Sequence, residues 1–391
     1  MGPTIRLPFN QHHPLQIAPQ LRDLQSRGAV HEVRTAMGDR AWLITSHDLV
    51  RRLLADERLG RSHPDPEHAP RTGESALFGG PQGDFDTEQV DHARMRALMQ
   101  PHFSPGQMRR LRPRVETLTT ELLDNLAEQG PPADLHAALA LPLPILVICE
   151  LIGVPYDDRD QFRKWTQAAA NVTDRARSEQ GLTDLFAYGR ELVARKRQDP
   201  GDDVISRWCA TDSVSDDEIA MLSMALLFAG HETTVVQIGL GALLLLSNPE
   251  QWRSLLGDPS LVPNAVEEIL RSPARGGDGI PRYARTEFDI EGNTVRKGDL
   301  VLLHPGAANR DEAVFDDPDR FDIARGAAGH LTFGHGPRYC IGAPLARIEL
   351  QAVFSLLVPR FPTMRPTVPA EELTLRRDVL TGGLIELPVT W

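Results

Sequence analysis

The chain has 391 residues, of which 41% are hydrophobic, and its 42 basic and 54 acidic residues give a formal net charge of −12. This length allows a large apolar core, and because no linker divides the chain we expect a single domain over residues 1–391. The acidic balance excludes a nucleic-acid-binding protein, which needs a basic face.

The cysteine pattern and the first residues indicate the compartment. The three cysteines, at positions 149, 209 and 340, are far apart, which argues against a zinc knuckle and against disulfides. The segment from Met1 to Pro8 lacks the apolar stretch of a signal peptide or membrane anchor. We therefore expect a cytoplasmic protein that makes no membrane contact.

The first quarter of the chain is predicted to contain a hairpin, a helix and a long loop. Residues 29–46 alternate apolar and polar around Met37-Gly-Asp39, which indicates a β-hairpin. Residues 47–59 have the apolar spacing of a helix. From Gly60 to Gln89 proline, glycine, histidine and acidic residues replace any periodicity, and a loop of this length is usually functional.

Helical periodicity dominates the middle of the chain, over residues 90–100, 105–129, 141–152, 158–172, 182–198 and 215–246. A second region of strands spans 282–304, with turns at Glu291-Gly-Asn293 and Lys297-Gly-Asp299, and residues 384–391 are short and extended. This order predicts a mainly α fold with small β-sheets that are segregated to one side.

The predicted helix over residues 215–246 carries an unusual polar break. It begins with the capping box Ser215-Asp-Asp-Glu218, and Ala229-Gly-His-Glu-Thr-Thr234 interrupts its apolar centre, which argues against a membrane span. A threonine within a helix often bonds only the carbonyl one turn back. An acid followed by two threonines is harder to explain in that way, because burying Glu232 without a partner costs several kcal/mol or neutralises it.

The most informative run is Phe333-Gly-His-Gly-Pro-Arg-Tyr-Cys340-Ile-Gly-Ala-Pro-Leu-Ala-Arg347, which places one cysteine between a glycine-rich loop and an apolar helix over 346–357. The positive end of a helix favours the thiolate form. Gly334, Gly336 and Gly342 let the backbone close around the sulfur. A thiolate in this setting is the expected ligand of a haem iron. A buried structural cysteine and a reactive nucleophile are the alternatives.

The complete pattern Phe-x-x-Gly-x-Arg-x-Cys-x-Gly closely resembles the haem-binding loop of the cytochromes P-450, the haem-thiolate monooxygenases. The resemblance covers nearly the whole chain and implies their single-domain, triangular-prism fold, with haem b (iron protoporphyrin IX) held through its iron by Cys340. The polar break resembles the oxygen-activating motif of the same family. By that match Gly230 leaves a groove for dioxygen, Thr233 hydrogen-bonds the activated oxygen, and Glu232 relays protons.

Further residues match the positions that bind haem carboxylates or lock the fold in this family. By the resemblance, the two propionates are bound by His92, Arg96, Arg282 and Arg338. His92 and Arg96 have the spacing of one helix face, and such a pair is more commonly a surface feature. Glu268-Ile-Leu-Arg271 resembles the Glu-x-x-Arg motif, which in the family is a buried structural pair ahead of the cysteine loop. A solvated surface pair is the default interpretation.

Substrate contacts are expected from the 60–89 loop, the helix around residue 229, the segment 276–280 and the segment 381–384. The apolar candidates are Leu77, Phe78, Phe85, Ala225, Ala229, Ile280 and Leu384. Packing is an equal alternative for Phe85. Several glycines, Gly276 and Gly277 among them, indicate a roomy cavity for a small-molecule substrate, which the sequence does not identify.

The sequence up to Trp391 contains no flavin domain. We therefore expect electrons from a ferredoxin and its NAD(P)H-dependent reductase. A basic docking patch for this carrier is one interpretation of the arginines at 94, 109, 110, 112 and 114, and a solvated helix face is the other.

The leading hypothesis is a monomeric monooxygenase that hydroxylates a secondary metabolite. The same chemistry used to form an intramolecular C–N, C–C or C–O bond is the first alternative. A haem-thiolate sensor without turnover and a peroxide-driven peroxygenase are alternatives of other kinds.

Overall fold

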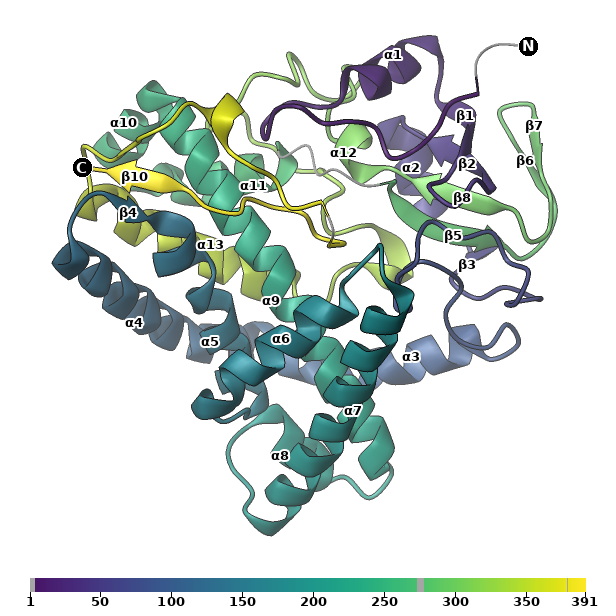
Figure 1. Cartoon of the computed structure of the whole chain (residues 1–391), viewed down its shortest axis with the longest axis horizontal. Helices are drawn as coiled ribbons and strands as arrows, with labels where there is room; N and C mark the ends of the chain where they lie inside the picture. The colour runs from purple at the N-terminus through teal and green to yellow at the C-terminus, as the bar shows by residue number, and fades with distance from the viewer. Residues whose placement is uncertain (1–3, 273–277, 378) are drawn as a thin grey trace.

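Helices make up most of the chain in the computed structural model, which describes residues 4–272, 278–377 and 379–391. The segment with Gly276 and Gly277, expected to border the substrate, lies outside these ranges. The longest helix, α9, passes through the middle of the molecule (Figure 1). The helices are α1 (Pro19–Arg27), α2 (His47–Leu54), α3 (Glu88–Met99), α4 (Pro105–Gln129), α5 (Pro142–Ile152), α6 (Arg159–Ala169), α7 (Arg175–Gln198), α8 (Val204–Cys209), α9 (Asp216–Ser247), α10 (Pro249–Gly257), α11 (Val262–Arg271), α12 (Pro305–Ala308) and α13 (Ala343–Arg360).

The strands of the described residues form three small sheets. The largest has the order β1-β2-β8-β5-β3, the second β4-β10-β9, and β6 pairs with β7. The strand β2 is parallel to β8, with Ala41 opposite Leu300, so this sheet joins the start of the chain to the segment before the cysteine loop. The bounds are β1 (Val30–Arg34), β2 (Arg40–Ile44), β3 (Leu59–Gly60), β4 (Ala133–Asp134), β5 (Ile280–Ala284), β6 (Phe288–Ile290), β7 (Asn293–Val295), β8 (Leu300–Leu303), β9 (Arg365–Pro366) and β10 (Pro388–Thr390).

The predicted fold class, mainly α with small β-sheets, is confirmed. The prediction that the strands are segregated to one side is wrong. In Figure 1 the five-stranded sheet lies to the right of α9, whereas β4 and β10 lie on its left. The difference arises because β10 pairs with β4, Val389 opposite Ala133, and not with the first sheet.

The core helix α9 is apolar on almost every side, which allows it to pass through the interior. Its predicted cap is present, since the Glu218 N–H donates to the Ser215 hydroxyl at 3.2 Å. By length and composition α9 is able to cross a membrane, but 72% of its most apolar stretch is buried inside the protein. It is therefore a core helix of this fold.

Most predicted boundaries hold to within two residues, and the exceptions have local causes. The helix α7 begins at Arg175, seven residues before the predicted start, because the Asp174 side chain caps it by accepting from the Arg177 N–H. The helix α2 ends at Leu54, and Leu59 belongs to β3. The short helices α1, α8 and α10 were not predicted.

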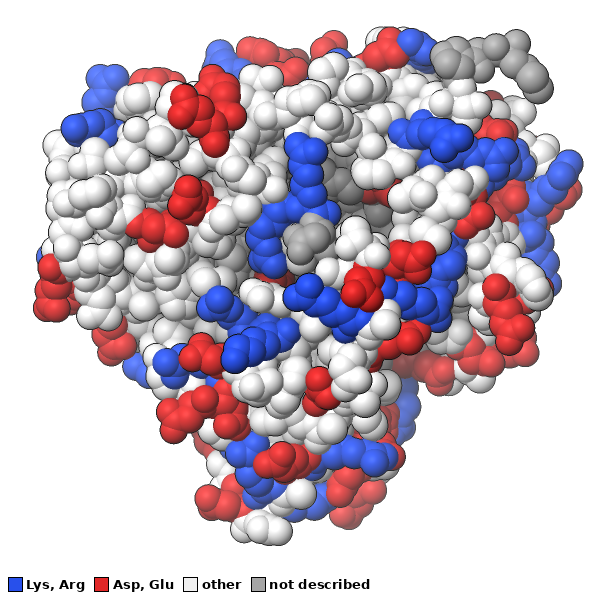
Figure 2. Space-filling view, viewed as in Figure 1, with Lys and Arg blue, Asp and Glu red and all other residues white. Residues whose placement is uncertain are grey.

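Basic side chains form a band across the middle of the face shown in Figure 2, over α6, α7 and the C-terminal segment. Exposed basic residues of these elements include Lys164, Arg175, Arg177 and Arg377. The net negative charge of the chain is therefore not spread evenly over its surface.

Candidate active site

The cysteine loop leads directly into α13, and Cys340 lies three residues before that helix begins. The Cys340 N–H donates to the Phe333 carbonyl at 2.9 Å, which closes the loop. Gly336 has a φ of +74°, and a Cβ there would lie 2.8 Å from the Ala55 Cβ, so only glycine lets the loop pack against the end of α2. Cys340 is exposed, whereas burial of Cys149 raises the pKa of that thiol to about 12.

Arg347 of α13 connects the cysteine loop to α11. Its guanidinium donates to both oxygens of Glu267, at 2.7 and 2.9 Å, and lies 4.7 Å from the centre of the Phe333 ring. His330 also contacts Glu267, at 3.1 Å. Burial pushes the pKa of Glu267 up, but the bonds with His330 and Arg347 outweigh burial and lower the pKa to about 2. The ionised carboxylate therefore holds the loop against α11 at neutral pH.

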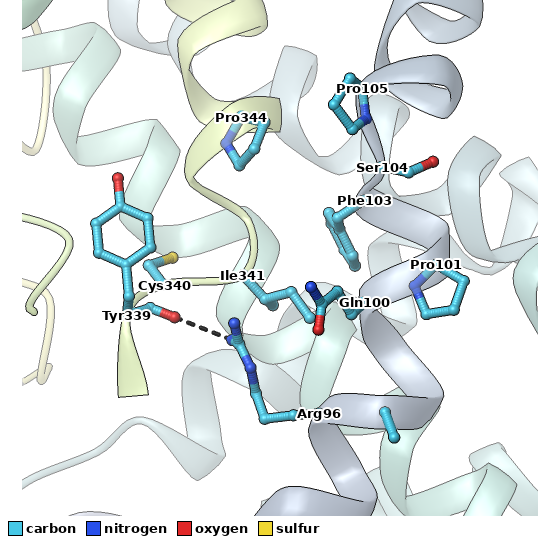
Figure 3. A pocket seen from close by; sticks show the side chains of 11 residues that line it. Arg96, Gln100, Pro101, Phe103, Ser104, Pro105, Tyr339, Cys340, Ile341 and Pro344 are labelled. Atoms are coloured by element: carbon cyan, nitrogen blue, oxygen red, sulfur yellow. Dashed lines mark hydrogen bonds between the residues drawn. The ribbon is translucent and has the colours of Figure 1, made fainter. Parts of the chain in front are cut away.

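A cavity of about 450 Å³ opens between the end of α3 and the start of α13 (Figure 3). Cys340, Ile341 and Arg96 line it, together with Phe103 from the short turn after α3. The Arg96 side chain donates to the carbonyl of Tyr339 at 2.9 Å and so holds the residue next to the cysteine.

One stripe of α9 remains accessible although most of the helix is buried. Met221, Ala225 and Ala229 are exposed, and Thr233 is partly exposed. Their spacing of four residues places them on one helix face. Small side chains leave room along this face, which is the arrangement that a flat cofactor and a substrate above it require.

The two threonines of the polar break bond back to their own helix. The Thr233 hydroxyl donates to the Ala229 carbonyl at 3.0 Å, and the Thr234 hydroxyl donates to the Gly230 carbonyl at 3.4 Å. The sequence did not decide whether the hydroxyls bond in this way. Because the Thr233 hydroxyl donates its proton to a carbonyl, the lone pairs of its oxygen are available to accept a hydrogen bond. A Cβ at Gly230 would lie 2.9 Å from Ile148, so this glycine also permits the close approach of α5.

Glu232 is a buried acid with a cationic partner from a distant segment. Its side chain is 2% exposed, and one oxygen accepts from Arg376 Nη1 at 3.4 Å. The other oxygen has no hydrogen bond among the described residues, with His231 Nε2 3.7 Å away. Burial, with Arg163 and Arg376 nearby, lowers the pKa of His231 to about 3, so this imidazole is neutral.

The residues predicted to bind the haem propionates lie in a cluster of positive charge. One further residue, Arg61, belongs to this cluster. Burial and the nearby Arg61 and Arg338 lower the pKa of Arg282 to about 9. Burial and the neighbouring guanidiniums lower the pKa of His92 to about 4. In the described part of the chain, Glu88 is the acid that acts on all of these groups. Such an excess of positive charge, on the buried Arg282 and the partly buried Arg61 and Arg338, fits an anion that the chain itself does not supply.

The residues predicted to bind the haem propionates differ in their bonding partners within the protein. Arg338 forms an ion pair with Glu88, whereas Arg282 Nη1 donates to the carbonyl of its neighbour Pro281 at 2.8 Å. The structure therefore brings the predicted set together but pairs Arg338 with an acid of the protein.

Glu268 and Arg271 of α11 form a fully buried ion pair, with N–O distances of 2.7 and 2.8 Å. Arg271 Nη1 also donates to the carbonyls of Asn309 and Pro318, both at 2.9 Å, and Glu268 accepts from the Asp322 N–H at 3.0 Å. These bonds offset the cost of removing both charges from water. The pair thus fixes the segment that leads to the cysteine loop.

The loop between β3 and α3 brings some of the predicted pocket residues to α9. The Phe78 ring lies 5.6 Å from the ring of Phe228, which is next to Ala229. Leu77 packs beside it against the core and is partly buried, and Ile280, at the start of β5, is also partly buried.

Two predicted pocket residues lie in packed surroundings. Phe85 lies 4.2 Å from the guanidinium carbon of Arg285 and 5.1 Å from the Lys297 ammonium, so it is the packing residue that the sequence left as an alternative. Leu384 is 1% exposed, packs near Gly239 of α9 and pairs with Leu375 in an antiparallel bridge. Phe85 therefore has a packing role, and Leu384 is a buried neighbour of α9.

Most of the arginines considered for a docking patch form ion pairs or hydrogen bonds within the chain. Arg94 pairs with Glu218 at 2.7 Å, and Arg114 pairs with Glu150 at 2.8 Å. Arg112 donates to Gln351 at 2.7 Å. The interpretation as a solvated helix face fits these three, while Arg109 and Arg110 are exposed and remain candidates.

The sequence patterns assigned no role to several residues of the site, namely Arg61, Glu88, Arg285, Arg347 and Arg376. Their partners are tens to hundreds of positions away in the sequence, as for Arg376 with Glu232. A sequence signal existed only for Arg347, which is the last residue of the cysteine run.

Comparisons with known proteins agree with this geometry. The family model described as Cytochrome P450 matches residues 190–379. Pentalenolactone synthase from Streptomyces exfoliatus is 45% identical over the full length of both chains. Two solved structures align with 100% of this chain and 100% of their own. They are substrate-free cytochrome P450 PimD, a pimaricin epoxidase (TM-score 0.90, 40% identity), and cytochrome P450mel 107F1, which has biaryl coupling reactivity (TM-score 0.88, 34% identity).

The comparisons place the chain among the haem-thiolate oxygenases, and the cysteine loop, the polar break of α9 and the cluster of cations fit that class. This chain belongs to the cytochrome P450 family. It is therefore a monooxygenase of the kind that tailors natural products, and the donors described above fit a haem.

Proposed function

We propose that this protein inserts one atom of dioxygen into a C–H bond of a secondary metabolite. The observation that carries the proposal is the exposed Cys340 at the start of α13 in a chain whose core helix presents an accessible face up to Thr233. Haem b, when bound, supplies the activation of dioxygen. Pentalenolactone synthase and the pimaricin epoxidase, which match over their full lengths, support a natural product as the substrate.

Cys340 is proposed as the iron ligand, and Thr233 and Glu232 as the catalytic residues. The Thr233 oxygen has lone pairs available on the accessible face of α9, and the buried carboxyl group of Glu232 is the acid–base group next to it in the chain. The ion pair with Arg376 keeps the Glu232 carboxylate stable while it is buried.

The remaining predicted residues have supporting roles in this proposal. His92, Arg96, Arg282 and Arg338 form the cationic side of the cofactor site, and Glu268 with Arg271 holds the segment before the cysteine loop. Leu77, Phe78, Ala225, Ala229 and Ile280 border the substrate. Phe85 is not part of this set, for the packing reason given above, whereas Leu384 stays in it as a buried neighbour of α9.

A second reaction, intramolecular bond formation, remains a candidate because cytochrome P450mel 107F1 has biaryl coupling reactivity and shares the fold over its whole length. Turnover under ¹⁸O₂ separates the two reactions. A hydroxylated product gains one labelled oxygen, whereas a coupled product gains none.

We further propose that residues 1–391 form one domain, a cytoplasmic monomer without flavin that receives electrons from a ferredoxin and its NAD(P)H-dependent reductase. The pairing of β2 with β8 and of β4 with β10 supports the single domain, because it connects distant parts of the chain. The exposed Arg109 and Arg110 support an acidic electron carrier.

The test of the thiolate ligand is the carbon monoxide difference spectrum of the reduced protein. Wild type should give the strongly red-shifted Soret band of a thiolate-ligated haem, and Cys340→Ser should lose that band. Cys209→Ser, at a partly buried position outside the cysteine loop, is the matched control and should retain it. A wild-type spectrum of the histidine type would contradict the proposal.

A further inference from the structure

The turn between α6 and α7 joins segments that border the proposed substrate site. On one side it holds the loop between β3 and α3, since the Ala76 N–H donates to the Ser178 hydroxyl at 3.1 Å. On the other side it holds the C-terminal segment, because the Leu380 N–H donates to the Ala170 carbonyl at 3.2 Å. Three segments that are far apart in the sequence therefore meet at this turn.

Two of these segments also contact α9 close to Thr233. The Phe78 ring lies 5.6 Å from the Phe228 ring, and a Cβ at Gly383 would lie 2.8 Å from Val236. Thr233 lies between Phe228 and Val236 in the helix. The joined segments thus form one border of the proposed substrate site.

The basic band of Figure 2 lies over α6, α7 and the C-terminal segment, which meet at this border. Lys164 of α6, Arg177 of α7 and Arg377 are exposed, and we call these three residues the surface cations. Within the described ranges none of them forms an ion pair, and Arg377 donates instead to Asn10 Oδ1 at 3.0 Å and to the Gln11 carbonyl at 3.1 Å. Their charges are therefore not paired with acids of the protein.

Positive charge continues from the surface toward α9 through Arg163 and Arg376. Arg163 is partly buried on α6, and the ring of its neighbour Phe162 lies 5.7 Å from the ring of His231 in α9. Burial and both arginines lower the pKa of His231, so both lie near this helix. Arg376 pairs with Glu232, whereas Arg163 forms no ion pair with any described acid. Arg163 is therefore an inner cation without a counter-ion.

This row of cations contrasts with the net charge of −12 of the whole chain. Unpaired charges of one sign beside a site raise the local concentration of the opposite ion and the rate at which it associates. A partly buried guanidinium is costly without an anion, and it binds a carboxylate or phosphate through two parallel hydrogen bonds. The row therefore fits an anion that comes from solution toward α9.

We propose that the substrate is an anionic metabolite, which the surface cations steer to the site and whose carboxylate or phosphate group Arg163 binds. This inference rests on the proposed function and names the chemical class of its substrate. Arg163 is then a specificity-determining residue, and the residues proposed to act on dioxygen keep their roles.

The first test uses two probes that bind a haem iron through the same imidazole nitrogen and differ in charge. They are para-(imidazolyl)benzoate and its neutral methyl ester, and stopped-flow absorbance measures how fast each binds the haem-loaded protein. At an ionic strength of about 0.1 M, where the Debye length of about 10 Å screens remote acids, the anion should bind several-fold faster than the ester. At about 1 M this advantage should disappear. Equal rates for the two probes at the lower ionic strength would overturn the proposal.

The same measurement locates the entry site. A triple variant with glutamine in place of all three surface cations should bind the anion about as slowly as the ester and should bind the ester as wild type does. The control replaces three exposed arginines of other elements, Arg51→Gln in α2, Arg253→Gln in α10 and Arg365→Gln in β9, and should keep the wild-type ratio of rates. Equal losses in the two triple variants would reflect net charge alone and would overturn the proposed entry site.

Arg163 is tested by the equilibrium affinity for both probes, with the meta isomers added so that the carboxylate is presented in two directions. Arg163→Gln should weaken binding of the better anion about tenfold relative to its ester, because a charged hydrogen bond is lost. Arg163→Lys keeps the charge and should recover most of this ratio. A change in the shape of the site would weaken anion and ester alike, so an unchanged ratio in Arg163→Gln would overturn the assignment.

A third probe, imidazolyl phenylphosphonate, separates the two sources of charge. Binding tighter than that of the benzoate supports a phosphate ester as the substrate, and weaker binding supports a carboxylic acid. If Arg163→Gln does not fold, the triple variant of the surface cations still decides the proposal. Failure of the haem site is distinguishable, because wild type would then lack the thiolate-type carbon monoxide spectrum and would bind neither probe through iron.

Discussion

At the scale of single residues, the two adjacent threonines of α9 differ: the Thr233 hydroxyl is the one that we propose to be catalytic, and the Thr234 hydroxyl is structural. Thr233 is partly exposed on the accessible face of the helix, whereas Thr234 is 5% exposed. Both hydroxyls donate to a carbonyl one turn back. The two positions thus have the same local bonding but different access to the proposed site.

We predict that Thr233→Val uncouples electron consumption from product formation. Loss of the hydroxyl removes a group proposed to control proton transfer, so product per NAD(P)H should fall about 10²-fold, within the range typical of general acid–base groups. The measurement compares NAD(P)H consumed, product formed and hydrogen peroxide released.

The matched control for this variant is Thr234→Val, which removes the neighbouring hydroxyl on the buried side of the same turn and should retain most of the coupling. Equal loss of coupling in the two variants would show that the helix, and not the Thr233 hydroxyl, is responsible.

At the scale of elements, the contact of α9 with α11 and α13 depends on one glycine. A Cβ at Gly241 would lie 2.6 Å from Ile269 Cγ2 of α11 and 3.0 Å from the Phe354 ring of α13. Because α11 carries the Glu268–Arg271 pair and α13 follows Cys340, this contact sets the spacing between the core helix and the cysteine loop.

We therefore expect Gly241→Ala to destabilise the protein by about 1–3 kcal/mol through overpacking. Urea unfolding of the haem-loaded protein measures the change. The control is Gly257→Ala at the end of α10, where a Cβ meets no atom within 4 Å. A stability loss of the same size at both positions would contradict the packing explanation.

Features whose signal lies within one short stretch of sequence could be predicted. Features that depend on contacts with other residues could not. The cysteine loop and the polar break of α9 each lie within one short run, so the residues of these runs and their resemblance to the family's motifs were enough to propose Cys340 and Glu232. The start of α7 was missed because its capping residue, Asp174, precedes any apolar periodicity. Phe85 was assigned to the pocket because hydrophobicity does not distinguish a pocket residue from one that packs against Arg285 and Lys297.

At the scale of the whole molecule, the sequence predicted the fold class but not the long-range pairings. Nothing in residues 40–44 indicates that their partner in the sheet is β8, and nothing in Glu88 indicates Arg338 as its partner. Such contacts depend on the complete fold, and a single sequence contains no periodicity that reports them. For this reason the sequence predicted the cationic cluster without Arg61 and without Glu88.

The stability of the whole protein should depend on pH through its buried neutral histidines. The folded pKa of His231, about 3, lies below the ordinary value of 6.5, so the unfolded chain binds a proton more readily. His231 therefore leaves the free energy of unfolding unchanged above pH 6.5. As the pH falls from 6.5 toward 3, it lowers the free energy of unfolding by up to about 1.4 kcal/mol per pH unit.

Urea unfolding of the haem-loaded protein between pH 4 and pH 8 measures this dependence. We expect the curve of unfolding free energy against pH to be flatter for His231→Gln than for wild type below pH 6.5, and the two curves to run parallel above it. Parallel curves over the whole range would show that His231 does not contribute.

The parallel pairing of β2 with β8 has a consequence for biosynthesis. The hairpin of β1 and β2 leaves the ribosome early, but the strand that covers the free edge of β2 begins only at Leu300. At roughly 5–20 residues per second, the apolar edge Ala41–Ile44 waits about 13–50 s for its partner. An unpaired edge of this kind is prone to associate with other chains. The nascent protein is therefore most exposed to aggregation while its middle third is being translated, and slower synthesis of that region would lower its yield.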